Sequence, residues 1–253
     1  MRTRASLAAL VVIAVIATAC DRTETRAESS TAPVTSTTPS GSSTAPSPAT
    51  AKHRDEALVR VVHAAPGGFQ LDLFAGDLVL FDGLGFKSVS PYRAVEGKRY
   101  AFALRPAGMT QAKAISSNTE GLRNGDFYTA FAMPGADGHS PTLRVVNDHL
   151  DTPAAGKAQL RIVHAGVDAG EIDVRGSGQM LFDGVDYQSI TDYREVTPVN
   201  GLIEIVGSGE SGAVLNSFHT HLDAGRFYTI LIVGSASGTP KLEAFLIEDA
   251  LAP

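Results

Sequence analysis

The sequence predicts an all-β protein, in which two tandem antiparallel β-sandwiches follow a disordered stalk. Three observations support this prediction. The chain repeats itself after Glu56, each copy is a series of short apolar runs separated by turn residues, and no segment of either copy sustains a helical apolar period for three turns. The residues before the repeat are rich in Ser, Thr and Pro.

The composition limits the class of protein. The chain has 253 residues, of which 43% are hydrophobic and 19% are charged. It is long enough to bury one or two cores of ordinary size. Its single cysteine excludes a disulfide framework within the chain. The net charge of −6 argues against a nucleic-acid partner, because phosphate binding needs clustered Lys and Arg.

The first residues predict export. Arg2 and Arg4 supply a positive start, residues 5–19 carry no charge, and small residues lead to Cys20. This is the pattern of a secretory signal peptide over residues 1–19. The apolar run is shorter than the roughly 20 residues that a helix needs to cross a bilayer, which argues against a permanent transmembrane anchor.

The position of Cys20 indicates a lipid anchor. Cleavage after Ala19 would leave this cysteine as the first residue of the mature chain, and the arrangement resembles the lipobox of bacterial lipoproteins. The resemblance implies lipidation of Cys20 and a place on the outer face of the bacterial cytoplasmic membrane. It has one departure, because Ala17 stands where lipoproteins usually have Leu. Ala17-Thr18-Ala19 also suits the ordinary signal peptidase, so free secretion is the alternative.

Residues 20–56 are predicted to form the lipidated cysteine and its stalk. Between Ser29 and Thr50, 13 of 22 residues are Ser or Thr, four are Pro, and none is charged or aromatic. Nothing in this stretch offsets the entropy of ordering the chain, so we expect a disordered linker, of a composition that is often O-glycosylated.

The repeat predicts two domains. Residues 57–64 match residues 158–165 at an offset of 101, and 14 of the 39 positions in residues 57–95 are identical at that offset. Solenoid units are only about 20 to 50 residues long, so a longer period indicates a domain duplication. The predicted domains are residues 57–152 and 156–253. In each, apolar runs at the spacing of a sandwich or small barrel predict about seven strands.

The repeated motifs carry a family resemblance. They are Arg-Val-Val-His-Ala, an Asp nine residues after the His, a Phe-Asp-Gly turn and a Tyr-Arg-x-Val segment. With these motifs the chain resembles a tandem member of the bacterial family called domain of unknown function 4397. The resemblance implies immunoglobulin-like sandwiches and export, often as a lipoprotein, and it brings no catalytic residue. Gly166-Val167-Asp168 replaces Ala65-Pro66-Gly67 after the second histidine, so the loops of the two copies are expected to differ.

Four polar residues recur in both copies and are the types that a hydrolase uses. They are His63, Asp72, Ser88 and Tyr92, and their counterparts His164, Asp173, Ser189 and Tyr193. A Ser–His–Asp relay needs hydrogen bonds in series and an oxyanion hole, and no G-x-S-x-G elbow surrounds either serine. We interpret these residues as structural, with each His half-buried and bonded to the Asp or to loop backbone. No catalytic residue is therefore assigned.

His219, His221 and Asp223 form the best metal pattern. Alternate residues of a strand share a face, so the three side chains could point the same way. They supply three ligands at most, and solvated strand histidines are the alternative interpretation, so no metal is assigned. Residues 207–212 match a dinucleotide fingerprint by letter, but a strand-like segment follows where a helix is required. No cofactor is expected.

These observations predict a noncatalytic lipoprotein of the cell envelope. We expect its sandwiches to present loops or an edge strand to an extracytoplasmic protein or glycan, and its lipid to bind the membrane. The alternatives are a metal-binding protein that uses the second domain and a hydrolase of the Ser–His type.

Overall fold

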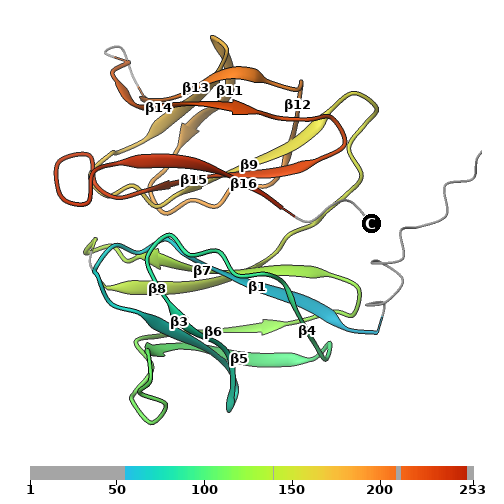
Figure 1. Cartoon of the computed structure of the whole chain (residues 1–253), viewed down its shortest axis with the longest axis vertical. Coiled ribbons are helices and arrows are strands. Elements are labelled where there is room, and N and C mark those ends of the chain that lie inside the picture. Colours follow the sequence, from blue (N-terminus) through green and yellow to red (C-terminus); the bar gives the residue numbers. More distant parts are fainter. Residues whose placement is uncertain (1–54, 139, 209–211, 250–253) are drawn as a thin grey trace, which may run out of the picture. The chain divides into compact units, whose positions relative to one another are not determined.

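A computed structural model describes residues 55–138, 140–208 and 212–249 (Figure 1). The sequence predictions for the signal peptide, for lipidation of Cys20 and for the stalk up to residue 54 concern residues outside these ranges. Within them the protein is all-β and forms two sandwiches, which confirms the predicted fold class. No helix in the described ranges is long and apolar enough to cross a membrane.

The first sandwich contains eight strands in its described residues, one more than expected. They are β1 (Ala57–His63), β2 (Leu71–Ala75), β3 (Leu78–Leu84), β4 (Arg93–Val95), β5 (Arg99–Pro106), β6 (Ser116–Gly121), β7 (Phe127–Pro134) and β8 (Pro141–Asn147). One sheet has the order β4-β1-β7-β8 and the other has the order β3-β2-β5-β6.

The second sandwich repeats this topology. Its strands are β9 (Ala158–His164), β10 (Ile172–Gly176), β11 (Gln179–Val185), β12 (Arg194–Val196), β13 (Asn200–Gly207), β14 (Val214–His221), β15 (Phe227–Val233) and β16 (Glu243–Glu248). The sheets have the orders β12-β9-β15-β16 and β11-β10-β13-β14, so each strand occupies the place of its counterpart in the first sandwich.

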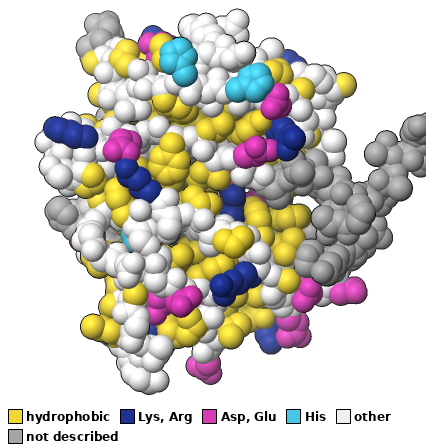
Figure 2. Space-filling view, viewed as in Figure 1, with side chains coloured by type: hydrophobic (Ala, Val, Ile, Leu, Met, Phe, Trp, Pro, Cys, Tyr) yellow, Lys and Arg dark blue, Asp and Glu magenta, His cyan; other side chains and the backbone are white. Residues whose placement is uncertain are grey.

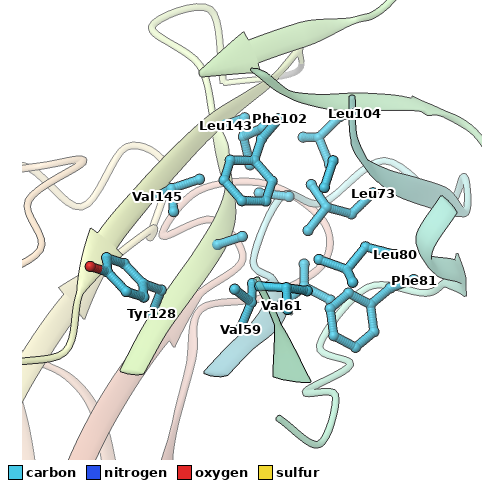
Figure 3. Close-up of a cluster of buried hydrophobic side chains, with 14 of the residues drawn as sticks. Val59, Val61, Leu73, Leu80, Phe81, Phe102, Leu104, Tyr128, Leu143 and Val145 are labelled. Carbon is cyan, nitrogen blue, oxygen red and sulfur yellow. The ribbon is translucent and has the colours of Figure 1, made fainter. Parts of the chain in front are cut away.

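Each sandwich has its own core between its two sheets. In the first, Val59 and Val61 of β1 meet Leu73, Phe102 and Leu104 of the opposite sheet, as Figure 3 shows. The second sandwich has an equivalent cluster of buried apolar residues. Alternate residues of a strand point to opposite faces of its sheet, so only every second residue of β1 belongs to this core.

The other face of β1 is also buried. Val62 on β1 and Phe131 on β7 join Val163 and Leu231 of the second sandwich in a third apolar cluster. Both sandwiches belong to one compact unit of the chain. Burial on two faces explains why β1, β7 and their counterparts read as continuous apolar runs rather than as alternating patterns.

One strand pair in each sandwich departs from the expected antiparallel arrangement. β1 pairs with β7 in parallel and β9 pairs with β15 in parallel, whereas every other named pair of the described strands is antiparallel. A parallel pair needs a long crossover connection. In the first sandwich the chain from β2 to β6 supplies it: β2, β3, β5 and β6 form the opposite sheet, and β4 pairs with β1.

Candidate functional site

The two repeated histidines are buried at the ends of β1 and β9, deeper than the predicted half-burial. His63 is 1% exposed and His164 is 0% exposed. The ring of His164 contacts the Gly170 carbonyl oxygen through Nε2 at 2.8 Å and accepts the Gly166 N–H at Nδ1 at 3.2 Å. Neither ring nitrogen of His63 has a well-formed hydrogen bond, and its ring packs beside Phe69 and Phe86. Burial lowers the pKa of both histidines.

The side chains of the repeated aspartates accept hydrogen bonds from turn and loop residues rather than from the histidines. Asp72 accepts the backbone N–H groups of Gly83 at 2.8 Å and Gly108 at 2.9 Å. Asp173 accepts the N–H of Gly184 at 3.0 Å and the hydroxyl of Ser208 at 2.8 Å. These two bonds lower the pKa of Asp173.

The repeated serines form backbone hydrogen bonds with the repeated histidines. The carbonyl oxygens of Ser88 and Ser189 each accept the N–H of the histidine in their own copy at 2.9 Å. The Ser88 hydroxyl is buried without a partner among the described residues. In neither copy does a hydrogen bond between described side chains join the serine, histidine and aspartate. The structure therefore joins the serine and histidine of each copy through the backbone, places the aspartate on the opposite sheet, and does not form a relay.

The repeated tyrosines belong to a buried polar network between the sandwiches. Tyr92 donates its hydroxyl to Asp148 at 2.8 Å, and Tyr193 donates its hydroxyl to Asp249 at 2.7 Å. Burial and the neighbouring aspartate raise the pKa of each tyrosine. Each aspartate directly follows the last strand of its sandwich.

Two arginines cross the boundary between the sandwiches to reach these aspartates. Arg60 of β1 donates to Asp249, and Arg161 of β9 forms an ion pair with Asp148 at 2.8 Å. Each arginine also donates Nε to a buried threonine of its own sandwich, Thr129 at 2.9 Å or Thr229 at 2.8 Å. We call these residues the buried network: Arg60, Tyr92, Thr129, Asp148, Arg161, Tyr193, Thr229 and Asp249.

The electrostatics of the buried network keep both arginines charged. Burial alone would lower the pKa of Arg60, but the interactions with Asp249, Tyr92 and Asp148 together outweigh burial and raise it. Burial likewise opposes the charge of Arg161, and the interactions with Asp148, Tyr193 and Asp249 together raise its pKa. Both guanidinium groups also lie over tyrosine rings, 4.9 Å from the Tyr92 centroid and 4.6 Å from the Tyr193 centroid. The network is thus a satisfied structural element and not an exposed reactive site.

Sequence reasoning identified the tyrosines but missed the rest of the buried network. The available signal was an arginine in the middle of a continuous apolar strand, which occurs at Arg60 and again at Arg161. An ionised side chain at such a position requires an acidic partner.

The metal candidates of the second sandwich are at the surface. His221 Nε2 lies 2.8 Å from Asp223 Oδ1, and both side chains are more than half exposed. His219 is exposed on the same strand, and Leu222 is fully buried. Figure 2 shows exposed histidine side chains in this region. Among the described residues no group of three or more His, Cys, Asp or Glu side chains gathers closely enough to hold a metal ion.

A surface pocket of about 460 Å³ lies beside β11 and β12 of the second sandwich. β11 and β12 are edge strands of the two sheets, and Arg194 links them by donating to the Leu181 carbonyl oxygen at 3.0 Å. Met180, 49% exposed, supplies apolar surface. The polar lining comes from Lys157, Ser177, Gln179, Arg194, Glu195, Thr197 and Asn200.

Two of the polar side chains that line the pocket form no hydrogen bond with other described residues of the fold. Within the described part of the chain, no side-chain hydrogen bond occupies the exposed amide groups of Gln179 and Asn200. At the offset of 101, the first sandwich has Leu78 and Arg99 at these positions, so the fold does not require the amides. The pocket therefore offers donors and acceptors that are free to bind a ligand.

Comparisons with solved structures give only distant likenesses. The C-terminal domain of AlgF from P. aeruginosa is 16% identical over 37% of this chain and 99% of its own length, with a TM-score of 0.27. A streptococcal virulence factor that binds α-glucan is 10% identical over 69% of this chain and 92% of its own, with a TM-score of 0.23. A candidate cell adhesion protein from Bacteroides uniformis is 10% identical over 77% of this chain and 98% of its own, with a TM-score of 0.22.

Likenesses of this strength carry no argument about ligand or activity. No curated protein matches the chain. Residues 57–175, which span the first sandwich together with β9 and β10, match the model of a family described as a domain of unknown function, DUF4397, and this match supports the family to which the repeated motifs point.

Proposed function

We propose that this protein is a noncatalytic binding protein of the bacterial envelope, and that the pocket beside β11 and β12 binds an extracytoplasmic glycan. One observation carries the proposal: the pocket presents amide groups that the fold does not use. Amide, hydroxyl, carboxylate and guanidinium groups are the partners that sugar hydroxyls require. A volume of about 460 Å³ is within the range of ligand sites in proteins.

The internal arrangement of the repeated polar residues supports a noncatalytic role. A hydrolase needs its base within hydrogen-bond reach of the nucleophile. Here the aspartates bind turn amides and the histidines are enclosed, so nothing in the motif is arranged for acyl transfer.

A glycan array tests this function on the chain from residue 21 onwards, which keeps both sandwiches and removes Cys20. The matched variant is Gln179→Leu/Asn200→Arg, because it installs the side chains that the first sandwich has at these positions. We expect the wild type to retain an envelope glycan and the variant to lose at least tenfold in affinity. The reciprocal control, Leu78→Gln/Arg99→Asn, alters only the first sandwich and should leave binding unchanged.

Two results would count against this assignment. Equal retention of glycan by the wild type and the pocket variant would place the site elsewhere. If instead no glycan binds and an envelope protein is captured in a pull-down that depends on the pocket residues, the ligand class is wrong.

The membrane anchor is part of the same proposal. A diacylglycerol on Cys20 with a further acyl chain would hold the mature protein at the membrane, because each buried methylene contributes about 0.8 kcal/mol. Cells fed labelled palmitate should incorporate label into the wild-type chain and not into a Cys20→Ser variant. Recovery of unlabelled wild-type protein from the culture medium would favour free secretion.

A further inference from the structure

The buried network between the sandwiches is built from equivalent residues on its two sides. In the buried network, Arg60 corresponds to Arg161, Tyr92 to Tyr193, Thr129 to Thr229 and Asp148 to Asp249. The contacts correspond as well, since each arginine bonds the threonine of its own sandwich and the aspartate of the other.

The apolar part of this boundary follows the same rule. Five of the six members contributed by the first sandwich have a counterpart in the cluster from the second. The sixth, Phe86, has none there, and neither do Ile190 and Phe245 of the second sandwich. The pairs are Val62 with Val163, Ala64 with Ala165, Phe131 with Leu231, Met133 with Val233 and Val146 with Ile247. The ion pairs are therefore reciprocal and most of the apolar contacts correspond in pairs, as in the interface of a homodimer.

We infer that this face also binds a second copy of the chain, in a reciprocal dimer in which the first sandwich of each copy docks on the second sandwich of the other. A self-complementary interface contains nothing that marks its partner as belonging to the same chain. An exchanged pair would bury the same two ion pairs and the same apolar cluster. Domain exchange of this kind has a small free-energy cost because no new contact is needed.

The rim of the boundary selects this arrangement over pairing of two first sandwiches. Lys87 forms an ion pair with Glu243, and the strand register places Thr142 at the equivalent position of the first sandwich. Gln188 donates to the Pro134 carbonyl oxygen at 2.7 Å, and Arg144 donates to the Gln188 carbonyl oxygen at 2.7 Å. A pair of first sandwiches loses these contacts, whereas an exchanged dimer keeps every one of them.

The protein concentration determines which form prevails: the monomer, in which the two sandwiches of one chain dock on each other, or the exchanged dimer. The connection between Asp148 and β9 is short, and a short connection gives an effective concentration in the millimolar range. The monomer therefore prevails in dilute solution. The dimer forms where chains fold at high local concentration or where docking within one chain is blocked.

A charge exchange tests the inference. One variant, Arg60→Asp/Asp148→Arg, reverses the two buried charges of the first sandwich. The other, Arg161→Asp/Asp249→Arg, reverses those of the second. Each alone places like charges opposite each other within its own chain. When the two are mixed, the inverted first sandwich meets the inverted second one, and both interfaces of an exchanged pair become complementary.

We expect light scattering to show a species of doubled mass in an equimolar mixture of the two variants, and none in either variant alone. The control carries all four substitutions in one chain, which restores complementarity internally and should give a folded monomer. A folded control together with a mixture that never pairs would refute the inference.

The wild type provides a second test that does not depend on whether the variants fold. The chain from residue 21 onwards is unfolded in denaturant and refolded over a range of concentrations up to the millimolar range. The fraction of doubled mass should rise with concentration and persist after dilution, because exchange back requires opening of the interface. Monomer alone at every concentration would overturn the inference. Neither test involves the pocket, so the proposed glycan site is tested separately.

Discussion

Arg60 combines the two conditions that make a single substitution costly: its side chain is 3% exposed, and its partner Asp249 is buried as well. Removing one member of a buried ion pair leaves the other charge uncompensated, at a cost of about 3 to 5 kcal/mol. We expect Arg60→Ala to lower the free energy of unfolding by about 3 kcal/mol or more. Denaturant unfolding followed by circular dichroism measures this change.

The control for this prediction is Arg99→Ala. Arg99 is an exposed arginine of the same sandwich, and substitutions of this kind usually change stability by less than about 0.5 kcal/mol. If Arg60→Ala is no more destabilising than Arg99→Ala, the ion pair with Asp249 contributes nothing to stability.

The buried histidines predict a pH dependence of stability. Burial lowers the folded-state pKa of His63 and His164, so the unfolded chain binds more protons between that value and the unfolded pKa of about 6.5. Stability is therefore lost as the pH falls below about 6.5, by at most about 1.4 kcal/mol per pH unit for each histidine. Unfolding measured from pH 7 to pH 5 should show a flatter dependence for His63→Gln/His164→Gln than for the wild type.

His219→Gln is the matched control for that pH series, because His219 is exposed on β14. It should follow the wild-type pH dependence. A double variant at the buried positions with the same slope as the wild type would show that those histidines become protonated equally in the folded and unfolded chains.

At the residue scale the sequence could predict which positions matter but not what they contact. The repeat identified His63, Asp72, Ser88 and Tyr92, and each has a definite place in the structure. The partners of Asp72 are backbone N–H groups, which no sequence pattern displays. The partner of Arg60 lies 189 positions away in the other sandwich, and proximity of this kind exists only after both copies have folded.

At the scale of strands, turn residues and apolar runs were sufficient to predict two sandwiches. They could not show the direction of pairing, because a strand buried on both faces has the same apolar pattern in a parallel or an antiparallel pair. The parallel pairs β1·β7 and β9·β15 were therefore missed. The eighth strand was missed because β4 and β12 have only three residues each.

The turn that follows β15 provides a prediction at the scale of one element. Gly234 has φ +88°, and a Cβ there would lie 2.2 Å from the backbone oxygen of Lys241. Backbone cannot move aside as a side chain can, so Gly234→Ala should cost more than the roughly 1 kcal/mol of an unfavourable φ alone. We expect a loss of at least about 2 kcal/mol, measured by denaturant unfolding.

Gly178, in the turn between β10 and β11, is the matched control. Its φ is +80°, and a Cβ there would meet nothing within 4 Å. Gly178→Ala therefore isolates the cost of the backbone conformation. Equal losses for the two alanine variants would mean that the contact with Lys241 relaxes without cost.

At the scale of the whole molecule, we expect the boundary between the sandwiches to couple the unfolding of the two cores. Each sandwich encloses its own apolar cluster, so each could in principle unfold separately. The third cluster and the two crossing ion pairs belong to both sandwiches and are lost when either one opens. The sequence repeat explains why the two cores are alike, but the coupling between them depends on contacts between copies that a repeat does not reveal.

This coupling predicts a change in the number of thermal transitions. The wild-type chain from residue 21 onwards should unfold in a single calorimetric transition, and Arg60→Ala/Arg161→Ala should unfold in two, because the variant leaves both aspartates buried without their arginines. Leu73→Ala creates a cavity in the core of the first sandwich and so shows which transition belongs to that sandwich. In the wild-type background it should lower the single melting temperature, and in the double variant it should lower one melting temperature and leave the other unchanged. Two separate transitions in the wild type would show that the buried network joins the sandwiches without coupling their stability.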